Sequence, residues 1–241
     1  MRITHYVTKC PFCGRASKQR LYLNSICLGC NAKFYYHNFT WLNRATGEKL
    51  YVLHDVTFVS EEKMREPNIF IIGDTHFWHK NIINYCNRPF ETVEEMNETL
   101  IKNWNKVVGK QDIVYVLGDF ALCGKDRIIE VGRALNGRKR LILGNHDGAS
   151  LETYREAGFE YFYNHSIILD EFYILSHYPQ TYIQKNGLYA NIYAHVHDDP
   201  AHVDVSSRTF CASVERSWMM YTPIKFEAIK QLMKECEENG E

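Results

Sequence analysis

The sequence predicts an α/β protein with a small β-rich module at its amino-terminal end. From about residue 68 onward, apolar strand-like runs alternate with amphipathic helical segments, and a block of strands follows. This order predicts a central sheet that is covered by helices and is partly antiparallel. Residues 1–59 differ, because they combine two Cys-x-x-Cys pairs with short β-rich runs. The polar segment 60–67 ends in Pro67 and predicts a linker, which divides the chain into domains 1–59 and 68–241.

The expected elements follow from the spacing of apolar residues. Strands are expected at 68–73, 112–117, 140–143, 166–169, 173–175, 191–194 and 209–214, and helices at 92–108, 127–135, 151–157 and 225–235. In the first of these helices, Met96, Leu100 and Trp104 recur at helical spacing, and Thr92 stands at the N-cap position. In the amino-terminal module, residues 43–47 are expected to form a hairpin turn, since Gly47 can adopt positive φ.

Composition and charge argue against several function classes. The chain is 45% hydrophobic and 24% charged, which is typical of a globular protein. A net charge of −1 gives no bulk electrostatic reason to bind nucleic acid or an anionic membrane. No apolar run approaches the ~18 residues of a membrane span, and no export signal is recognisable. We therefore expect the eight cysteines to be thiols or metal ligands in the cytoplasm, or in the host cytoplasm if the protein is viral.

Five polar clusters directly follow predicted strands. They read Gly73-Asp74-Thr75-His76, Gly118-Asp119, Gly144-Asn145-His146-Asp147, Ser176-His177 and Ala194-His195-Val196-His197. Ligand sites of α/β sheets gather at the carboxyl ends of strands, so five such ends would bring these side chains to one edge. Asp, Asn and His supply the oxygen and nitrogen donors of catalytic divalent metals. One cluster alone is typical of a turn or a cap, but five in this position predict a single metal site.

These motifs, in this order, resemble the calcineurin-like metallophosphoesterase superfamily over roughly residues 67–225. The resemblance implies a four-layer α/β/β/α sandwich that holds two divalent metals. It also implies the site residues: Asp74, His76 and His197 hold one metal, Asn145, His177 and His195 hold the other, Asp119 bridges them, and His146 is the catalytic histidine. Asp147 follows the catalytic histidine, and it could orient His146 or cap the next helix. The family's Gly-His-x-His is Ala194-His-Val-His here, so a turn must be made without glycine.

The ligand types define the expected chemistry. Histidine ligands make the site compatible with Mn, which we expect, and with Fe, Ni or Zn. Two metals ~3.5–4 Å apart can share a hydroxide, lower its pKa and clamp phosphoryl oxygens for in-line attack. His146 could then protonate the leaving group or stabilise charge in the transition state.

Two further residues are candidate substrate contacts. Arg88 precedes Pro89, which biases it toward an extended loop, and its guanidinium could clamp a phosphate or form a structural salt bridge. His79 lies just downstream of the first metal motif. His79 and the segment 85–90 resemble a subgroup of small bacterial and phage phosphoesterases.

The amino-terminal module is interpreted separately. Cys10, Cys13, Cys27 and Cys30 form two pairs that resemble the knuckles of a zinc ribbon. Four thiolates suit one tetrahedral structural Zn, which stabilises a module too small for a large core. A redox pair or a set of buried thiols is the alternative. The basic residues nearby could contact nucleic acid or form a solvated face, and the oligomeric state is open.

The sequence therefore favours a dinuclear-metal-dependent phosphohydrolase, in the first place a phosphodiesterase acting on a nucleotide or another small phosphate ester. The alternatives are a nuclease guided by the zinc ribbon, or a ribbon-based adaptor that binds nucleic acid or protein. An adaptor has no need for seven intact ligands and a catalytic histidine, so the enzyme is preferred. Short spacers between the motifs favour an open cleft without a capping domain.

Overall fold

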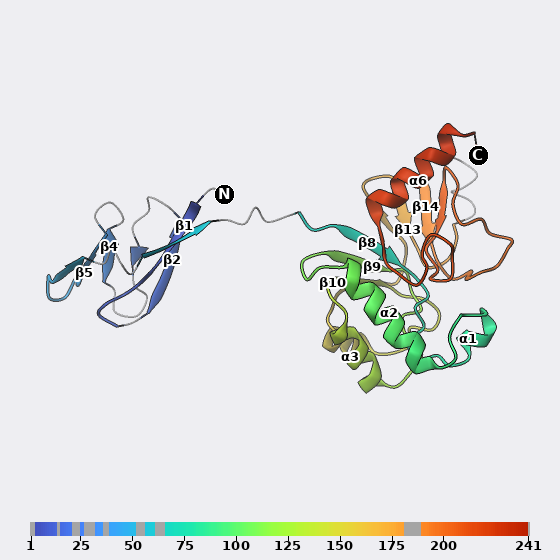
Figure 1. The fold of residues 1–241 in the computed structure, drawn as a ribbon, viewed down its shortest axis with the longest axis horizontal. Coiled ribbons are helices and arrows are strands. Elements are labelled where there is room, and N and C mark those ends of the chain that lie inside the picture. Colours follow the sequence, from blue (N-terminus) through green and yellow to red (C-terminus); the bar gives the residue numbers. More distant parts are fainter. Residues whose placement is uncertain are drawn as a thin grey trace. The chain divides into compact units, whose positions relative to one another are not determined.

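The computed structural model describes residues 3–13, 15–20, 25–26, 32–35, 39–51, 56–60, 66–180 and 189–240. Backbone contacts divide the chain into two compact units, Met1–Glu66 and Pro67–Glu241 (Figure 1). Of the expected linker, residues 61–65 lie outside the described residues.

The smaller unit contains two antiparallel sheets. The first has the order β2-β1-β7 and consists of β1 (Ile3–Lys9), β2 (Ala16–Arg20) and β7 (Val56–Ser60). The second runs from β3 (Ser25–Ile26) through β4 (Lys33–Tyr35) and β5 (Thr40–Leu42) to β6 (Lys49–Tyr51). The hairpin turn expected between the last two strands is confirmed, because the Gly47 N–H donates to the Asn43 carbonyl at 2.8 Å and Gly47 has a φ of 76°.

The larger unit is built on two mixed sheets, of which the first has the order β11-β10-β9-β8-β16. Its strands are β8 (Ile69–Ile72), β9 (Ile113–Val116), β10 (Arg138–Ile142), β11 (Phe159–Tyr163) and β16 (Ile224–Lys225). The pairs among β8, β9, β10 and β11 are parallel, and β16 is antiparallel to β8. Three of the four residues in β8 and in β9 are buried, as in strands covered on both faces.

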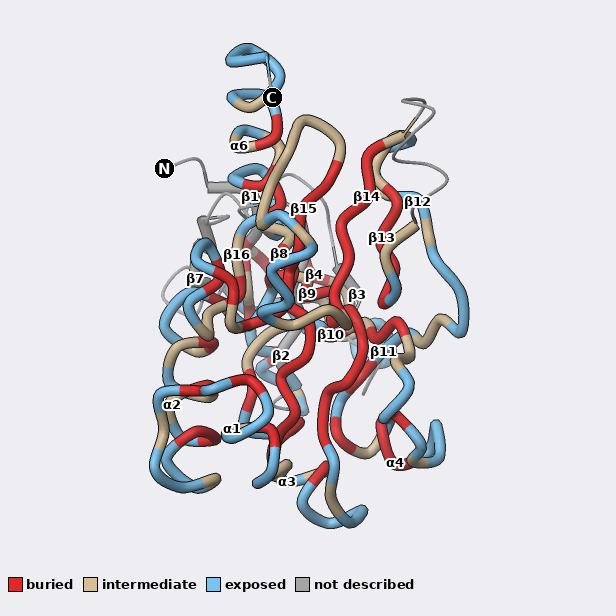
Figure 2. The backbone as a smooth tube through the Cα atoms, turned by 90° about the vertical axis from the view of Figure 1, so that its right-hand side faces the viewer, coloured by how far each residue is buried: buried red, intermediate tan, exposed pale blue. Residues whose placement is uncertain are grey.

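The second sheet has the order β12-β13-β14-β15. It consists of β12 (Ile167–Leu169), β13 (Tyr173–Leu175), β14 (Ala190–Tyr193) and β15 (Thr209–Cys211). The pairs β13–β14 and β14–β15 are parallel, whereas β12 is antiparallel to β13. Strands β14 and β15 are buried along their whole length (Figure 2).

Helices lie against both sheets, so the expected α/β fold with parallel and antiparallel strands is confirmed. They are α1 (Ile82–Tyr85), α2 (Val93–Val107), α3 (Lys125–Ala134), α4 (Leu151–Glu156) and α6 (Phe226–Glu238). Figure 1 shows α2 and α3 on the side of the first sheet and α6 beside the second. The Phe226 ring of α6 packs against the Tyr173 ring of β13, with the two ring centroids 5.0 Å apart. At α2, the Thr92 hydroxyl caps the Glu95 N–H, as the sequence predicts.

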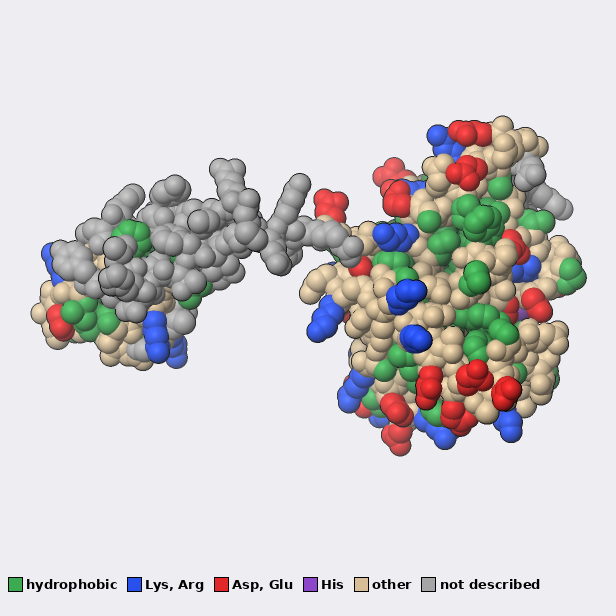
Figure 3. All heavy atoms as spheres, viewed as in Figure 1, with side chains coloured by type: hydrophobic (Ala, Val, Ile, Leu, Met, Phe, Trp, Pro, Cys, Tyr) green, Lys and Arg blue, Asp and Glu red, His purple; other side chains and the backbone are tan. Residues whose placement is uncertain are grey.

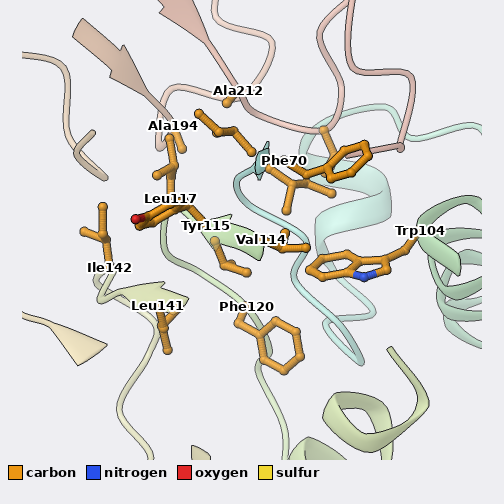
Figure 4. Packing of buried hydrophobic residues seen from close by; sticks show 14 of the residues in the cluster. Phe70, Trp104, Val114, Tyr115, Leu117, Phe120, Leu141, Ile142, Ala194 and Ala212 are labelled. Atoms are coloured by element: carbon orange, nitrogen blue, oxygen red, sulfur yellow. The ribbon is translucent and has the colours of Figure 1, made fainter. Parts of the chain in front are cut away.

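The core lies between the helices and the two sheets. Phe70, Val114 and Leu117 from the first sheet lie near Ala194 and Ala212, which follow β14 and β15 (Figure 4). The sheets also meet through the backbone, because the Gly73 N–H donates to the Ala212 carbonyl at 2.8 Å. This contact holds the carboxyl ends of β8 and β15 together. None of the described helices combines the length and apolar character that a bilayer crossing needs.

Gly73 is required by the close approach of the two sheets. A Cβ at position 73 would overlap the Cβ of Ala194 and lie 3.4 Å from the Ala212 carbonyl oxygen. We expect Gly73→Ala to lower the free energy of unfolding by about 2 kcal/mol, as overpacking does. Adding Ala194→Gly removes the overlapping methyl group and should recover most of the loss in urea unfolding. An equal loss with and without Ala194→Gly would contradict the clash.

Three short elements were not anticipated from the sequence: α1, β11 and β16. Strand β11 carries an aromatic run and pairs in parallel with β10 at the sheet edge. Strand β16 has only two residues and exists because it pairs with β8. Such short or edge segments lack a periodic signal of their own, so tertiary pairing decides them.

Candidate metal centre

Six strands of the larger unit end at the same place. Asp74 and His76 follow β8, Asp119 follows β9, Asn145 and His146 follow β10, His177 follows β13, and His195 and His197 follow β14. Ser213 and Glu215 follow β15. The convergence expected from the sequence is therefore present, because parallel neighbours deliver their carboxyl ends to one edge.

Five of the expected metal ligands adopt left-handed backbone conformations. They are Asp74, His76, Asp119, His195 and His197, with φ between 47° and 74°. Such conformations cost non-glycine residues of order 1–3 kcal/mol each and cluster at functional sites. The positive φ of the last motif falls on its two histidines, and Ala194 is not among the positive-φ residues. This explains how the turn is made with alanine where the family has glycine.

The first group of candidate ligands is Asp74, His76 and His197, whose ligand atoms lie within 4.8 Å of one another. The Asp74 Oδ2 accepts hydrogen bonds from the His195 N–H at 2.7 Å and the Ser213 hydroxyl at 2.6 Å. Its Oδ1 and the His76 Nε2 are buried and have no hydrogen-bond partner. Unpartnered buried donors and acceptors are costly, and a bound cation would satisfy both.

The second group is Asp119, His177 and His195, which meet the same distance limit. The His177 Nδ1 lies 2.8 Å from the Leu117 carbonyl and donates to it, which leaves Nε2 as the ring nitrogen available to a metal. That Nε2 faces the Asn145 Oδ1 at 2.9 Å. Both atoms therefore lie close enough to coordinate one shared cation.

Asp119 connects the two groups. Its Oδ2 lies 3.5 Å from the His76 Nε2 and 3.6 Å from the His177 Nε2. Its Oδ1 accepts the His146 N–H at 2.8 Å. One carboxylate oxygen is therefore placed between the nitrogen ligands of both groups, as a bridging ligand requires.

Burial shapes the charges of the first group. Burial raises the pKa of Asp74 to about 6, against the lowering effect of His197 and His177. It also lowers the pKa of His76 far below its ordinary value, together with the nearby His197 and Arg88, which keeps His76 neutral. Neutral imidazole and carboxylate are the forms that ligate metals. The residues present therefore fit two divalent cations.

Burial also lowers the pKa of His197, but other effects outweigh it. Hydrogen bonds to Cys86 and Glu215 and the charges of Asp74 and Glu215 raise that pKa to about 11. Both nitrogens of this ring are therefore protonated in the absence of metal. The Nδ1 lies 3.0 Å from the Glu215 Oε1 and donates to it, so Nε2 is the nitrogen that must release its proton to bind a cation.

A cavity of about 380 Å³ opens above the two groups. Its lining includes most of the expected site residues and several neighbours: His76, His79, Ile82, Tyr85, Cys86, Asp119, Leu122, Asn145, His146, His195 and His197. Asn145 and His146 are exposed, whereas Asp74 and His177 are buried beneath. The His79 Nδ1 lies 3.1 Å from the His76 Nδ1, so His79 both faces the cavity and orients a candidate ligand.

The family model of calcineurin-like phosphoesterases matches residues 67–235. The chain belongs to this family. The family match agrees with the geometry of the site, in which Asp119 lies between two groups of candidate metal ligands.

The chain is similar to three individual proteins. It is 56% identical over 86 residues to the uncharacterized protein MJ1445 of Methanocaldococcus jannaschii, covering 35% of this chain and 49% of the relative. It is 44% identical over 84 residues to the Gene 66 protein of Mycobacterium phage L5, covering 34% and 40%. The chain thus spans half or less of the length of these relatives. A solved structure of a protein of unknown function, AQ665 from Aquifex aeolicus, is similar with a TM-score of 0.55 and 29% identity, covering 69% of this chain and 99% of that one.

The structure corrects the expectation that Arg88 clamps a phosphate. Its side chain is fully buried in the phosphoesterase unit, and all three guanidinium nitrogens donate to protein acceptors. The acceptors are the Glu215 carboxylate, the carbonyls of Asp74 and Thr75, and the Met96 Sδ. The alternative of a structural salt bridge is what the structure shows.

The structure also corrects both roles expected for Asp147. Its Oδ2 accepts the N–H groups of Asp119 and Gly144, and its Oδ1 accepts the Phe120 N–H and the Tyr154 hydroxyl. No hydrogen bond reaches the His146 ring from this carboxylate among the described contacts, and Ser150 is the N-cap of α4. Asp147 is buried and holds the loops after β9 and β10 together.

Three residues near the site escaped the sequence interpretation: Ser213, Glu215 and Cys86. Glu215 directly follows the predicted strand 209–214, so the strand-end rule could have found it, whereas Ser213 lies within that predicted strand and follows β15 only in the structure. Glu215 has no glycine before it and no histidine beside it, so the sequence around it carries little metal-site signal. Cys86 forms a third group with His197 and Glu215, within 4.8 Å, and no motif in the sequence singles it out.

The expected zinc ribbon remains a prediction. Cys10 is buried and Cys13 is exposed in the smaller unit, and the Cys10 N–H donates to the Arg15 carbonyl at 2.9 Å. Cys27 and Cys30 lie outside the described residues.

Proposed function

We propose that this phosphoesterase is a dinuclear-metal-dependent phosphohydrolase that cleaves phosphodiesters of nucleotide size or smaller. The observation that supports it is the Asp119 carboxylate, which lies between two groups of metal-competent residues below an open cavity. Asp74, His76 and His197 would hold one cation, and Asn145, His177 and His195 the other. Mn is the proposed metal, and Fe, Ni or Zn would also suit the ligands.

The proposed reaction is an in-line displacement at phosphorus. Two bound cations supply a nucleophile at neutral pH and neutralise charge on the phosphoryl oxygens. The chain's own contribution begins with Asp119, whose Oδ1 holds the His146 N–H and thereby places that residue at the cavity wall. His146 would then donate a proton to the leaving-group oxygen. His79, on the same cavity, is a proposed substrate contact.

The cavity supports a small substrate. Its volume of about 380 Å³ suits a phosphate ester of nucleotide size. Figure 3 shows basic and acidic side chains together on one face of the larger unit, in keeping with the net charge of −1. A nuclease guided by the amino-terminal unit is the second candidate, supported by the exposed Lys9 and Arg15 beside the first cysteine pair.

A substrate panel tests this proposal. The full chain, loaded with Mn or treated with a chelator, is assayed on aryl phosphodiesters, aryl phosphomonoesters, cyclic nucleotides and oligonucleotides. We expect Mn-dependent hydrolysis of the diesters and loss of activity with the chelator. A folded, Mn-loaded protein that hydrolyses none of them would overturn the proposal. Oligonucleotide cleavage that falls in Lys9→Glu/Arg15→Glu, with aryl ester cleavage unchanged, would favour the nuclease.

His146→Gln is expected to lower kcat by about 10²–10⁴, as loss of a general acid does. The loss of kcat should be larger for esters with a poor leaving group, such as a nucleoside, than for p-nitrophenyl esters, because p-nitrophenolate departs without protonation. Metal content should stay at the wild-type level, because the imidazole is not a proposed ligand. Steady-state kinetics on both leaving groups, with metal analysis, measure this. An equal loss for both leaving groups would contradict the proton-donor role.

We also propose one structural Zn on Cys10, Cys13, Cys27 and Cys30. The buried Cys10 and the turn at Arg15 support it. Metal analysis and thiol titration of the purified chain test it, and four titratable thiols without zinc would exclude the site. Cys86, Cys123, Cys211 and Cys236 are thiols in the structure, which supports the cytoplasm as the proposed compartment.

A further inference from the structure

A buried ion pair lies directly behind the first ligand group. The Arg88 Nη2 is 2.6 Å and the Nε is 2.9 Å from the Glu215 Oε1. Arg88 and Glu215 are separated by 127 residues, and their side chains are 0% and 3% exposed. Burying such a pair is costly and is weak evidence for stability. Its contacts with the metal centre therefore need an explanation of their own.

Both partners contact the first ligand group. The His197 Nδ1 donates to the same Glu215 Oε1 at 3.0 Å. Arg88 donates to the Asp74 carbonyl at 2.8 Å and to the Thr75 carbonyl at 3.0 Å. The pair thus joins the loops that follow β8, β14 and β15, and these loops carry all three ligands of the first group.

The chemistry of the contacts explains what the pair does. A carboxylate that accepts from Nδ1 of a histidine fixes the tautomer and makes the other ring nitrogen a better metal donor. The positive charge of Arg88 stabilises Glu215 as an ionised carboxylate, and this carboxylate accepts the hydrogen bond from the His197 Nδ1. The two carbonyl contacts of Arg88 hold Asp74 in its left-handed conformation, with a φ of 53°.

The second ligand group has a different support. Its His177 donates to the Leu117 carbonyl, and Asp119 is held by Asp147 through its backbone N–H. Neither contact involves Arg88 or Glu215. Loss of the ion pair should therefore affect the two groups unequally.

We propose that Arg88 and Glu215 are positioning residues that set the metal affinity of the group Asp74, His76 and His197. This inference rests on the proposed dinuclear centre. It predicts that removing either partner weakens one metal site by 10–100-fold, as loss of such a support does, and leaves the other site unchanged. Because Arg88 and Glu215 act as a unit, the double variant Arg88→Met/Glu215→Gln should lose no more metal affinity than whichever single variant binds metal more weakly.

The test is a titration of the metal-free full chain with Mn²⁺, followed by calorimetry and electron paramagnetic resonance. Wild type should bind two ions and give the spectrum of a coupled pair. Glu215→Gln, which keeps the side-chain volume, and Arg88→Met should bind one ion at wild-type affinity and the second 10–100-fold more weakly, and they should give the spectrum of an isolated ion until the weaker site fills. Lys139→Met is the matched control, because Lys139 is also a buried cation, bonded only to the Leu135 and Gly137 carbonyls among the described contacts.

The outcomes separate this inference from the proposed function. A folded wild type that binds no Mn²⁺ would overturn the dinuclear centre and this inference with it. Two ions in wild type, and two with unchanged affinity in both single variants, would overturn this inference alone. Equal weakening of both sites would show a general structural role and would also overturn it. If Arg88→Met does not fold, Glu215→Gln decides, with circular dichroism as the check on folding.

Discussion

Asp119→Asn is expected to lower kcat/KM by about 10³-fold or more and to reduce the bound metal from two ions to one or none. The proposed bridging oxygen lies 3.5 Å from the His76 Nε2 and 3.6 Å from the His177 Nε2. An amide has no negative charge to share between two cations, so several kcal/mol of metal and transition-state stabilisation are lost. Hydrolysis of an aryl phosphodiester and metal analysis of the same preparation measure both effects.

Asp112→Asn is the matched control for this variant. Asp112 precedes β9 at the end of the strand remote from Asp119, and it is likewise buried. Its carboxylate accepts the N–H groups of Asn68 at 2.9 Å and Gly109 at 2.8 Å. Asp112→Asn should change stability while leaving the metal content at two. Asp119→Asn with two metals and wild-type activity would exclude the bridging role.

Asp147→Ala is expected to lower the free energy of unfolding by about 4 kcal/mol. Its carboxylate accepts four hydrogen bonds, from the N–H groups of Asp119, Phe120 and Gly144 and from the Tyr154 hydroxyl. Each donor left buried without an acceptor costs roughly 1–3 kcal/mol, of which partial hydration recovers some. Urea unfolding of the metal-free full chain measures the loss.

Tyr154→Phe provides a graded comparison, since it removes one of the four bonds, at 3.2 Å, and leaves the backbone contacts in place. We expect it to cost about 1 kcal/mol. Activity should also fall in Asp147→Ala, because the loop that carries Asp119 loses its anchor. If the alanine variant is no less stable than Tyr154→Phe, Asp147 does not hold these loops.

The strand-end rule accounts for most of what the sequence could predict. Val114–Leu117 shows why: an apolar run is buried as a strand, and the polar Asp119 that follows must lie at its end. The same local argument locates Asp74, Asn145 and His177. It needs the hydrophobic pattern, which each segment carries locally, and the parallel order that strand–helix alternation implies.

Pairings between distant segments could not be predicted in this way. The Arg88 side chain can be fully buried because the Glu215 carboxylate, 127 residues away in the sequence, accepts hydrogen bonds from its guanidinium. The sequence around Arg88 carries no trace of that partner, so it leaves both a phosphate clamp and a structural salt bridge open. Asp147 is a similar case, because its donors come from the loop after β9 and from α4.

The sequence by itself determined the α/β class, the hairpin turn at Gly47, the N-cap at Thr92 and the set of residues that meet at one edge. These depend on side-chain type, periodicity and backbone preference, which each segment carries alone. Only the tertiary structure decided which oxygen of Asp74 is left for a cation, that Asp119 lies between two ligand groups, and that Arg88 and Asp147 support the site from beneath. Those facts depend on which buried donor finds which acceptor, and that choice is made when distant loops pack together.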